Sequence, residues 1–315
     1  MASQGGAQIV SIPHLSFNTD NAVQLGATFD ATKLAGRSVV ITGGASGIGE
    51  ASVRAFVTAG AFVTFGDIAV EQAEAIVSEL GSEKVAFVPC DVLVWAEQLQ
   101  LFKTAIEKSP SKSIDVVCAN AGIAVTDELL VDAEKIAADP TADPVEPKLS
   151  TLKVNTIGVA YTAKLATHYL VKRPGEEEKD RALIITASLA GYLDMPAAPQ
   201  YNASKWGVRG LFRSLRNSLP AHGIRVGLIS PWFIKTRIVP VAAQQQLDAV
   251  KYDWALVEDA ASAILHIAAE QSVNGRSLTV VPRSVDPRGY VDANQDNVVA
   301  GNAMATWKAN IGLPV

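Results

Sequence analysis

The sequence predicts an α/β fold built on one doubly wound, parallel sheet of seven strands with helices on both faces. From Arg37 onward, short runs rich in β-branched residues alternate with longer segments of helical periodicity, which is the pattern of repeated βαβ units. The strand runs are apolar almost throughout, as expected when helices cover both faces of a sheet. With 315 residues and 49% hydrophobic composition the chain can bury a substantial core, so we expect one large domain.

The individual elements follow from these patterns. The strands are expected at 38–42, 61–66, 84–88, 114–119, 182–187, 225–229 and 277–281. Segments 49–60, 70–81 and 95–109 carry apolar residues at spacings of three and four, which predicts helices that pack on the sheet. The first two of these segments end at a glycine that suits a helix C-cap.

Three regions lie outside this alternation. We expect the domain to occupy residues 34–283, with an N-terminal extension at 1–33 and a C-terminal extension at 284–315. A proline-punctuated insertion at 139–148 has three open roles, which are lining the entrance to a site, contacting another subunit, or neither.

Composition excludes several classes of function. The net charge of −5 and the pI near 5.5 argue against a nucleic-acid partner, which requires a basic face. No apolar run reaches the roughly 20 residues that cross a bilayer, and the N-terminus has no Lys or Arg before Lys33, which argues against a secretory signal. Cys90 and Cys118 lie in apolar stretches, so we expect inert thiols in a reducing compartment. A cytoplasmic protein without a membrane span is therefore predicted.

Glycines follow the first strand directly. Gly43, Gly44, Gly47 and Gly49 lie between this strand and the first helix, where glycine permits a tight turn and lets a pyrophosphate approach the backbone. The positive end of the helix dipole then faces the anion. The alternative is an ordinary flexible turn, but the βαβ setting favours a nucleotide site.

Asp67 ends the second strand at a spacing from the glycines that suits an acid on the adenosine ribose. A carboxylate there repels a 2′-phosphate, and Ala45, Ser46 and Ile68 offer no compensating positive charge. The cofactor is therefore expected to be NAD rather than NADP. The alternative is that Asp67 only caps the helix that follows.

A second group of polar residues occurs late in the chain. Tyr201 and Lys205 are four residues apart in a helical segment, so their side chains share one face. Ser188 lies just past the fifth predicted strand, at the edge of a parallel sheet where ligands bind. Each residue alone has an ordinary structural explanation, such as a turn serine or a core tyrosine.

Together these motifs resemble the short-chain dehydrogenase/reductase family, whose domain is of the Rossmann type. The resemblance rests on TGGASGIG, CDV, NAG, VNTIG, the serine and Tyr-x-x-x-Lys, in this order over roughly residues 35–283. Within the family, the segment SVNGRSLTVVPRSVDPRGY and Asp67 look most similar to the NAD-dependent 15-hydroxyprostaglandin dehydrogenase-like branch, which oxidises lipid-like and polyketide-like alcohols.

The resemblance implies roles for four catalytic residues. Tyr201 is the general base or acid, Ser188 orients the substrate oxygen, Lys205 binds the nicotinamide ribose, and Asn155 supports a water that relays the proton. A phenol has an unperturbed pKa of about 10 and is a poor base at neutral pH. The Lys205 ammonium and the positive nicotinamide ring both favour its phenolate.

The resemblance also implies the residues that bind the cofactor, with Asp91 and Val92 at the adenine, Asn120 at the ribose and Thr236 near the nicotinamide amide. The full set is Gly43, Ser46, Gly47, Ile48, Gly49, Asp67, Asp91, Val92, Asn120, Ala121, Gly122, Tyr201, Lys205, Pro231 and Thr236. No metal is expected, because the four histidines and two cysteines show no ligand spacing.

One position departs from the family pattern. Pro231 is followed by Trp232, where many members have glycine, so the indole either narrows the nicotinamide pocket or packs outward. The family's substrate loop corresponds to about 231–255. It predicts an apolar cavity through Trp232, Phe233, Ile234, Ile238, Tyr252 and Trp254, with Tyr192, Leu193 and Met195 after the serine. Lys235 and Arg237 either face solvent or meet a substrate carboxylate.

The sequence therefore predicts an NAD-dependent oxidoreductase of secondary metabolism that interconverts a bulky hydrophobic secondary alcohol and its ketone by hydride transfer. Two alternatives keep the fold: a non-redox cyclisation or isomerisation with bound NAD(P), and a non-catalytic nucleotide sensor. The intact Ser188, Tyr201 and Lys205 disfavour both. A homodimer or homotetramer is implied by the resemblance.

Overall fold

The structure is a computed structural model, and it describes residues 22–125, 127, 129, 137–141, 143–171 and 179–293. Most of both predicted terminal extensions lies outside the described residues. In the part of the chain that the structure describes, no helix has the length and apolar character needed to cross a membrane.

One sheet of eight strands forms the centre of the fold, in the order β3-β2-β1-β4-β5-β6-β7-β8. The first seven are parallel to one another. They are β1 Ser38–Thr42, β2 Phe62–Asp67, β3 Val85–Pro89, β4 Val116–Ala119, β5 Arg181–Thr186, β6 Ile224–Pro231 and β7 Ser277–Val280. All seven predicted strands are confirmed, because uninterrupted apolar runs between turn residues are a strong strand signal.

The eighth strand corrects the prediction of a seven-stranded parallel sheet. β8, Tyr290–Asp292, pairs antiparallel with β7 and lies in the segment expected to be a C-terminal extension. The Arg276 guanidinium and the Asp292 carboxylate hold it in place with two hydrogen bonds of 2.7 Å. Asp292 also accepts a hydrogen bond from the Val23 backbone. Three residues are too few for a periodic pattern, so this strand could not be predicted from periodicity.

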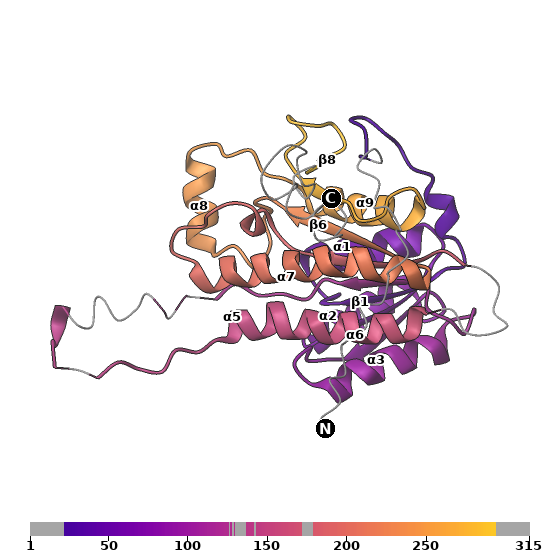
Figure 1. The fold of residues 1–315 in the computed structure, drawn as a ribbon, viewed down its shortest axis with the longest axis horizontal. Coiled ribbons are helices and arrows are strands. Elements are labelled where there is room, and N and C mark those ends of the chain that lie inside the picture. Colours follow the sequence, from indigo (N-terminus) through magenta and orange to yellow (C-terminus); the bar gives the residue numbers. More distant parts are fainter. Residues whose placement is uncertain are drawn as a thin grey trace, which may run out of the picture.

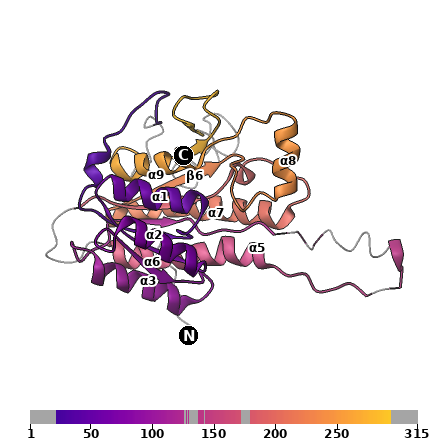
Figure 2. The ribbon, with the colours of Figure 1, turned by 180° about the vertical axis from the view of Figure 1, so that it is seen from behind.

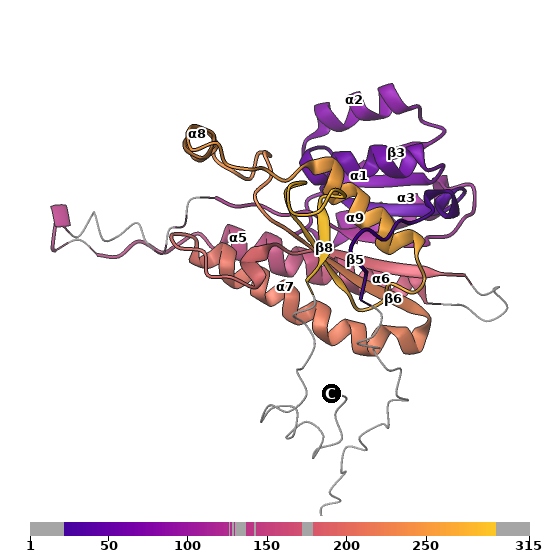
Figure 3. The ribbon, with the colours of Figure 1, turned by 90° about the horizontal axis from the view of Figure 1, so that it is seen from above.

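Helices cover both faces of the sheet and bury two separate hydrophobic clusters. On one face lie α1 Gly47–Thr58, α2 Val70–Leu80 and α9 Val257–Ala269, and on the other lie α3 Trp95–Lys108, α6 Val159–Leu170 and α7 Pro199–Ser218. Figure 3 shows α1 and α2 on the opposite side of the sheet from α6 and α7. Along β4, Val116 and Cys118 face the first cluster and Val117 faces the second. Burial on both faces explains why the strands are apolar throughout.

The three helices predicted from periodicity are confirmed as α1, α2 and α3. Gly60 follows α1 with a φ of 84°, and Gly81 ends α2 with a φ of 91°. Only glycine adopts such angles without strain, so these residues stop the helices as expected.

The remaining helices are short. They are η1 Ala31–Leu34, α5 Ser150–Leu152, η2 Lys153–Gly158, η3 Leu189–Gly191, η4 Leu219–His222 and α8 Val241–Ala249. In Figure 1, α7 lies along the helix that α5, η2 and α6 form together. α8 stands away from the body of the domain and has no buried residue.

The described part of the insertion at 139–148 extends away from the domain in two opposite views (Figures 1 and 2). Most of its described residues are exposed. This position is consistent with an insertion outside the βαβ pattern, and its role stays open.

Both cysteines are free and buried, and burial raises the pKa of the Cys90 thiol to about 12 and that of Cys118 still higher. Thiols of this kind are unreactive at neutral pH. Among the described residues, no group of three His, Cys, Asp or Glu side chains could hold a metal ion.

Candidate active site

The glycine-rich turn after β1 needs glycine for steric reasons. Gly43 and Gly47 have φ angles of 71° and 54°, a region that side chains rarely allow. A Cβ on Gly43 would lie 2.8 Å from the Ala121 Cα, and one on Gly49 would lie 1.8 Å from the Gly43 carbonyl oxygen. Ser46 is the N-cap of α1, but its side chain makes no capping hydrogen bond. The turn is therefore tightly packed against the backbone at Ala121 and against itself. The backbone N–H groups at the start of α1 suit a pyrophosphate.

The end of β4 holds this turn in place. Asn120 donates from Nδ2 to the carbonyl oxygens of Thr42 at 3.1 Å and Gly43 at 3.2 Å. The Thr42 hydroxyl accepts from the backbone of Asn120 and Ala121, at 3.1 and 3.2 Å. A Cβ on Gly122 would lie 3.2 Å from the Asn155 Oδ1, so this neighbour is close as well. The predicted residues Asn120, Ala121 and Gly122 thus lie directly beside the glycine-rich turn.

Asp67 lies at the end of β2, next to the same turn. Its Oδ2 accepts a hydrogen bond of 2.9 Å from the Ala45 backbone, and its Oδ1 accepts one of 3.0 Å from the Ala69 backbone. The second bond closes a local Asx turn just before α2, whose N-cap is Ala69, so it is not the helix cap of the alternative interpretation. Two carboxylate oxygens offer about four acceptor sites, so Asp67 can keep both backbone bonds and still accept from a ribose hydroxyl.

Asp91 and Val92 follow β3 in the turn that leads to α3. Asp91 accepts from the Leu93 backbone at 2.9 Å, and its own backbone N–H donates to Glu97 at 2.7 Å. Val92 is buried, and a Cβ on Gly158 would lie 2.7 Å from its side chain. Both residues lie at the carboxyl edge of the sheet, and their contact with adenine stays a prediction.

Ser188, Tyr201 and Lys205 come together at the carboxyl end of β5. Tyr201 and Lys205 lie one turn apart on α7, with the Lys205 Nζ 5.5 Å from the centre of the Tyr201 ring. Ser188 lies close enough to the Tyr201 phenol to lower its pKa through side-chain hydrogen bonding. Lys205 donates to the Thr186 carbonyl oxygen at 3.2 Å, and Thr186 Oγ1 donates to the Asn120 Oδ1 at 3.2 Å. This chain of contacts links the three residues to the glycine-rich turn.

Burial shifts the pKa values of both Tyr201 and Lys205. It raises the pKa of the Tyr201 phenol, while the hydrogen bond with Ser188 lowers it. Burial also lowers the pKa of the Lys205 ammonium to about 8. Burial disfavours the charged form of each group, so a further positive charge is needed to make the phenolate accessible. The oxidised nicotinamide ring supplies such a charge when it is bound.

Asn155 lies in η2, which is a single stretch of π-helix between α5 and α6. Its Oδ1 accepts from the Ile123 backbone at 2.8 Å, and its Nδ2 donates to the Ile123 carbonyl oxygen at 2.9 Å and to Ser204 Oγ at 3.1 Å. Ser204 in turn donates to the Tyr201 carbonyl oxygen at 2.7 Å. Asn155 therefore joins the loop after β4 to the helix that carries Tyr201. A π-helical turn often marks a functional site.

Asp127 fixes the first turn of α7. Its carboxylate accepts from the Gln200 backbone N–H at 2.6 Å and from the Gln200 side chain at 3.2 Å. The N-cap residue Ala198 has only a methyl side chain, which cannot accept a hydrogen bond from the first turn. An acid from outside the helix thus caps α7 one residue before Tyr201.

Pro231 ends β6, and Trp232 begins the loop that follows. The Pro231 carbonyl oxygen accepts a hydrogen bond of 3.4 Å from Ser188 Oγ, which holds the end of β6 beside Ser188. The half-buried Trp232 packs edge-on against Phe233 at 5.1 Å between ring centres. Phe233 packs against Tyr252, and Tyr252 against Trp254, which forms one aromatic row along the loop.

Tyr192 and Leu193, which were also predicted to line the apolar cavity, lie in different surroundings. Leu193 is exposed, in keeping with a place at an entrance. Tyr192 donates its hydroxyl to Ser277 Oγ at 2.8 Å, and the Arg209 guanidinium lies 3.8 Å above its ring. These contacts commit Tyr192 to packing within the domain.

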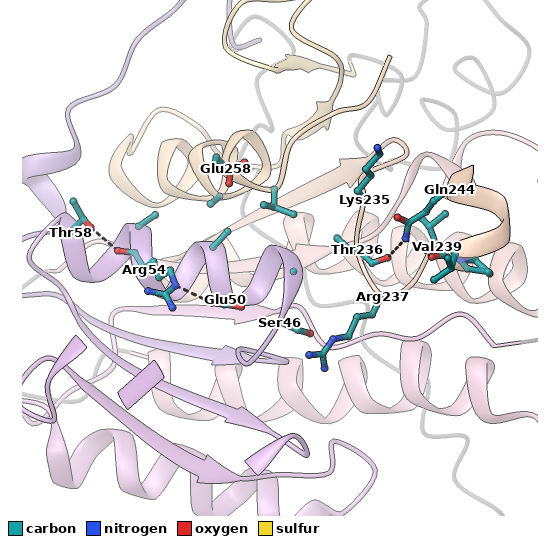
Figure 4. Close-up of a pocket in the computed structure, with 17 residues that line it drawn as sticks. Ser46, Glu50, Arg54, Thr58, Lys235, Thr236, Arg237, Val239, Gln244 and Glu258 are labelled. Carbon is teal, nitrogen blue, oxygen red and sulfur yellow. Dashed lines mark hydrogen bonds and ion pairs between the residues drawn. The ribbon is translucent and has the colours of Figure 1, made fainter. Parts of the chain in front are cut away.

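A groove of about 1030 Å³ runs between α1, α9 and the loop that leads to α8 (Figure 4). Ser46 and Gly47 line it together with Thr236. A Cβ on Gly47 would lie 3.2 Å from the Thr236 methyl group, so the loop touches the glycine-rich turn. Ser188, Tyr201, Lys205 and Asn155 do not line this groove.

Several supporting residues were not predicted from the sequence. Thr186, Ser204 and Asp127 act through contacts between distant segments, and no spacing in the sequence indicates them. Only Thr186 could have been suspected from the sequence, because it ends β5 at the carboxyl edge of the sheet, two residues before Ser188.

Comparison with known proteins identifies relatives over most of the chain. Residues 37–247 match the family described as short chain dehydrogenase. The 5'-hydroxyaverantin dehydrogenase of Dothistroma septosporum is 37% identical over 284 residues, which is 86% of this chain and 91% of that protein. The 5'-hydroxyaverantin dehydrogenase stcG of Emericella nidulans is 34% identical, with the same two coverages of 86% and 91%. The NADP-dependent dehydrogenase M3 of a Phoma species is 31% identical over 87% of this chain and 83% of that protein.

Proposed function

The chain belongs to the short-chain dehydrogenase/reductase family, and on that premise we propose that it oxidises a bulky hydrophobic secondary alcohol to the ketone with NAD. The observation that carries this proposal is the meeting of Ser188, Tyr201 and Lys205 beside the glycine-rich turn. Family membership already makes the chain an oxidoreductase that uses a nicotinamide cofactor on a small molecule.

The mechanism follows from these contacts. Bound nicotinamide supplies the hydride acceptor for the carbinol carbon. Ser188 lies close enough to the Tyr201 phenol for side-chain hydrogen bonding, so both hydroxyls can reach one substrate oxygen, which Ser188 orients while Tyr201 takes its proton. Lys205 is held by Thr186 and places its positive charge beside the Tyr201 ring, which stabilises the phenolate. A non-redox reaction or a sensor has no use for this buried pair, which counts against both alternatives.

Asp67 supports NAD as the cofactor. Its carboxylate lies beside the glycine-rich turn and keeps acceptor sites for ribose hydroxyls, while a 2′-phosphate there would meet a negative charge. The name of the Phoma relative specifies NADP, which makes NADP the alternative to test.

Replacing Asp67 tests the cofactor directly. Asp67→Asn keeps the size of the side chain and removes the charge, so we expect the ratio of kcat/KM for NAD over NADP to fall by about tenfold or more, which corresponds to about 1.4 kcal/mol of lost repulsion. Steady-state kinetics with both cofactors measures this ratio. Asp67→Glu keeps the charge and should keep the preference for NAD. An unchanged ratio in Asp67→Asn would refute the role of Asp67.

The relatives narrow the substrate class. Two of them are named for 5'-hydroxyaverantin, so this alcohol is the first candidate substrate, and the aromatic row from Trp232 to Trp254 offers an apolar wall for a bulky molecule. These names correct the expected likeness to the 15-hydroxyprostaglandin dehydrogenase-like branch, because the relatives are 5'-hydroxyaverantin dehydrogenases and an NADP-dependent dehydrogenase.

A substrate screen tests the proposed function. Purified protein with NAD is expected to oxidise 5'-hydroxyaverantin or a similar bulky secondary alcohol, seen as absorbance of reduced nicotinamide, while short linear alcohols should react poorly. Silence across a broad panel of bulky secondary alcohols with both NAD and NADP would reject the proposal.

The oligomeric state stays a prediction from the family resemblance. The exposed Ile157 of η2 and Trp206 of α7 lie on neighbouring helices and offer an apolar surface for a second subunit. A monomer in light scattering would contradict the expected homodimer or homotetramer.

A further inference from the structure

Three cationic side chains line the groove between α1, α9 and the loop that leads to α8. They are Arg54, Lys235 and Arg237, and the groove is also lined by Ser46 and Gly47. A cluster of positive charge at the start of a helix favours an anion, but only if the charges are not already paired.

Two of these cations are paired. Arg54 donates to Glu50 at 3.0 Å and to Glu79 at 2.7 and 2.8 Å. Lys235 donates to Asp248 of α8 at 2.9 Å. Arg237 is exposed and has neither an ion pair nor a hydrogen bond with any residue that the structure describes. Its guanidinium therefore has all five of its donors available.

The position of Arg237 indicates what it binds. It follows Thr236, whose methyl group lies against Gly47, and Figure 4 shows its side chain extending from the loop toward Ser46. We propose that Arg237 is a phosphate-binding residue whose guanidinium binds the pyrophosphate of the dinucleotide from the side opposite the glycine-rich turn. This inference rests on the dinucleotide part of the proposed function and is independent of the alcohol.

The chemistry of the two sides is complementary. The turn offers backbone N–H groups and the positive end of the α1 dipole, and the forked guanidinium offers two parallel donors that match a phosphate. Two carboxylates also line the groove, Glu50 and Glu258. Glu50 is paired with Arg54, and Glu258 lies in the first turn of α9. A substrate carboxylate is a poorer fit for Arg237, because none of the described catalytic residues lines this groove.

The test compares ligands with and without phosphate. Dissociation constants for adenosine, ADP and NAD are measured by calorimetry for the unmodified protein, Arg237→Gln and Arg237→Lys. Arg237→Gln should weaken ADP and NAD by about tenfold and leave adenosine within about twofold, since one charge-assisted contact is lost. Arg237→Lys keeps the charge without the fork and should be intermediate. Lys103→Gln, an exposed residue of α3, removes the same charge elsewhere and should change none of the three constants.

The binding constants of Arg237→Gln and of the unmodified protein also define the results that would overturn the proposal. Unchanged ADP and NAD binding in Arg237→Gln, or an equal loss for adenosine, would overturn the proposal. Failure of the unmodified protein to bind either ADP or NAD would overturn it together with the cofactor assignment. If the phosphate-dependent loss is seen and no alcohol is oxidised, Arg237 keeps its role and only the proposed reaction fails.

Discussion

Tyr201→Phe is expected to lower kcat for alcohol oxidation by about a thousandfold or more, within the range that general-base catalysis contributes. The change removes one hydroxyl, which lies close to Ser188, and keeps the ring beside Lys205. Folding should therefore be retained. Single-turnover measurement of reduced nicotinamide gives the rate of the chemical step.

A control and a pH profile separate this role from packing. Tyr169 lies in α6, and its ring stacks on Phe102 of α3. Tyr169→Phe removes a hydroxyl from this ring and should leave the rate unchanged. In the unmodified protein the rate should rise with pH, because burial raises the pKa of Tyr201 and the base works only when deprotonated. The residual rate of Tyr201→Phe should lose this dependence. Near-normal oxidation by the variant would show that another group takes the proton.

Lys205→Met is expected to reduce oxidation by a similar factor and, at the same time, to stabilise the protein. Lys205 is almost fully buried, and burial lowers its pKa from 10.5 to about 8. A shift of this size corresponds to about 3 kcal/mol, and loss of the bond to the Thr186 carbonyl offsets part of it. A gain on the order of 2 kcal/mol remains, which raises Tm by roughly 3 °C.

The pH dependence of this gain has a definite sign. Below pH 8 the lysine is charged in both states, so the folded protein carries the full cost of burying the ammonium. Between pH 8 and 10.5 the folded state releases the proton first, and the cost disappears. Thermal unfolding without cofactor should thus show the largest difference in Tm at pH 7 and little difference near pH 10.5. A lower Tm for the variant at pH 7 would mean that the ammonium stabilises the fold.

The strands and the proximity of Tyr201 and Lys205 could be predicted because their signals are local. An apolar run bounded by turns, a glycine with a positive φ and a pair of residues one helical turn apart all leave a pattern within a few positions. β1 and the Tyr201–Lys205 pair are examples. The position of Ser188 then followed from the rule that ligands bind at the carboxyl edge of a parallel sheet.

The features that were missed depend on contacts between distant segments. β8 exists because Arg276 and Asp292 pair across the sheet edge, and α7 begins where it does because Asp127 caps Gln200. The π-helical turn that carries Asn155 has the same residue types as an ordinary helix, so periodicity could not reveal it. Arg237 was expected at the surface or at a substrate carboxylate, and only the groove that it shares with Ser46 indicated a phosphate.

Transfer of deuterium from the alcohol to NAD tests the proposed hydride transfer. The protein is incubated with NAD and a bulky secondary alcohol that carries deuterium on the carbinol carbon, and the reduced nicotinamide is analysed by mass spectrometry. Hydride transfer in the site of Ser188, Tyr201 and Lys205 predicts that the deuterium appears in the nicotinamide as the ketone forms. A reduced cofactor without deuterium, or a product formed with no reduction of the cofactor, would contradict the proposed reaction.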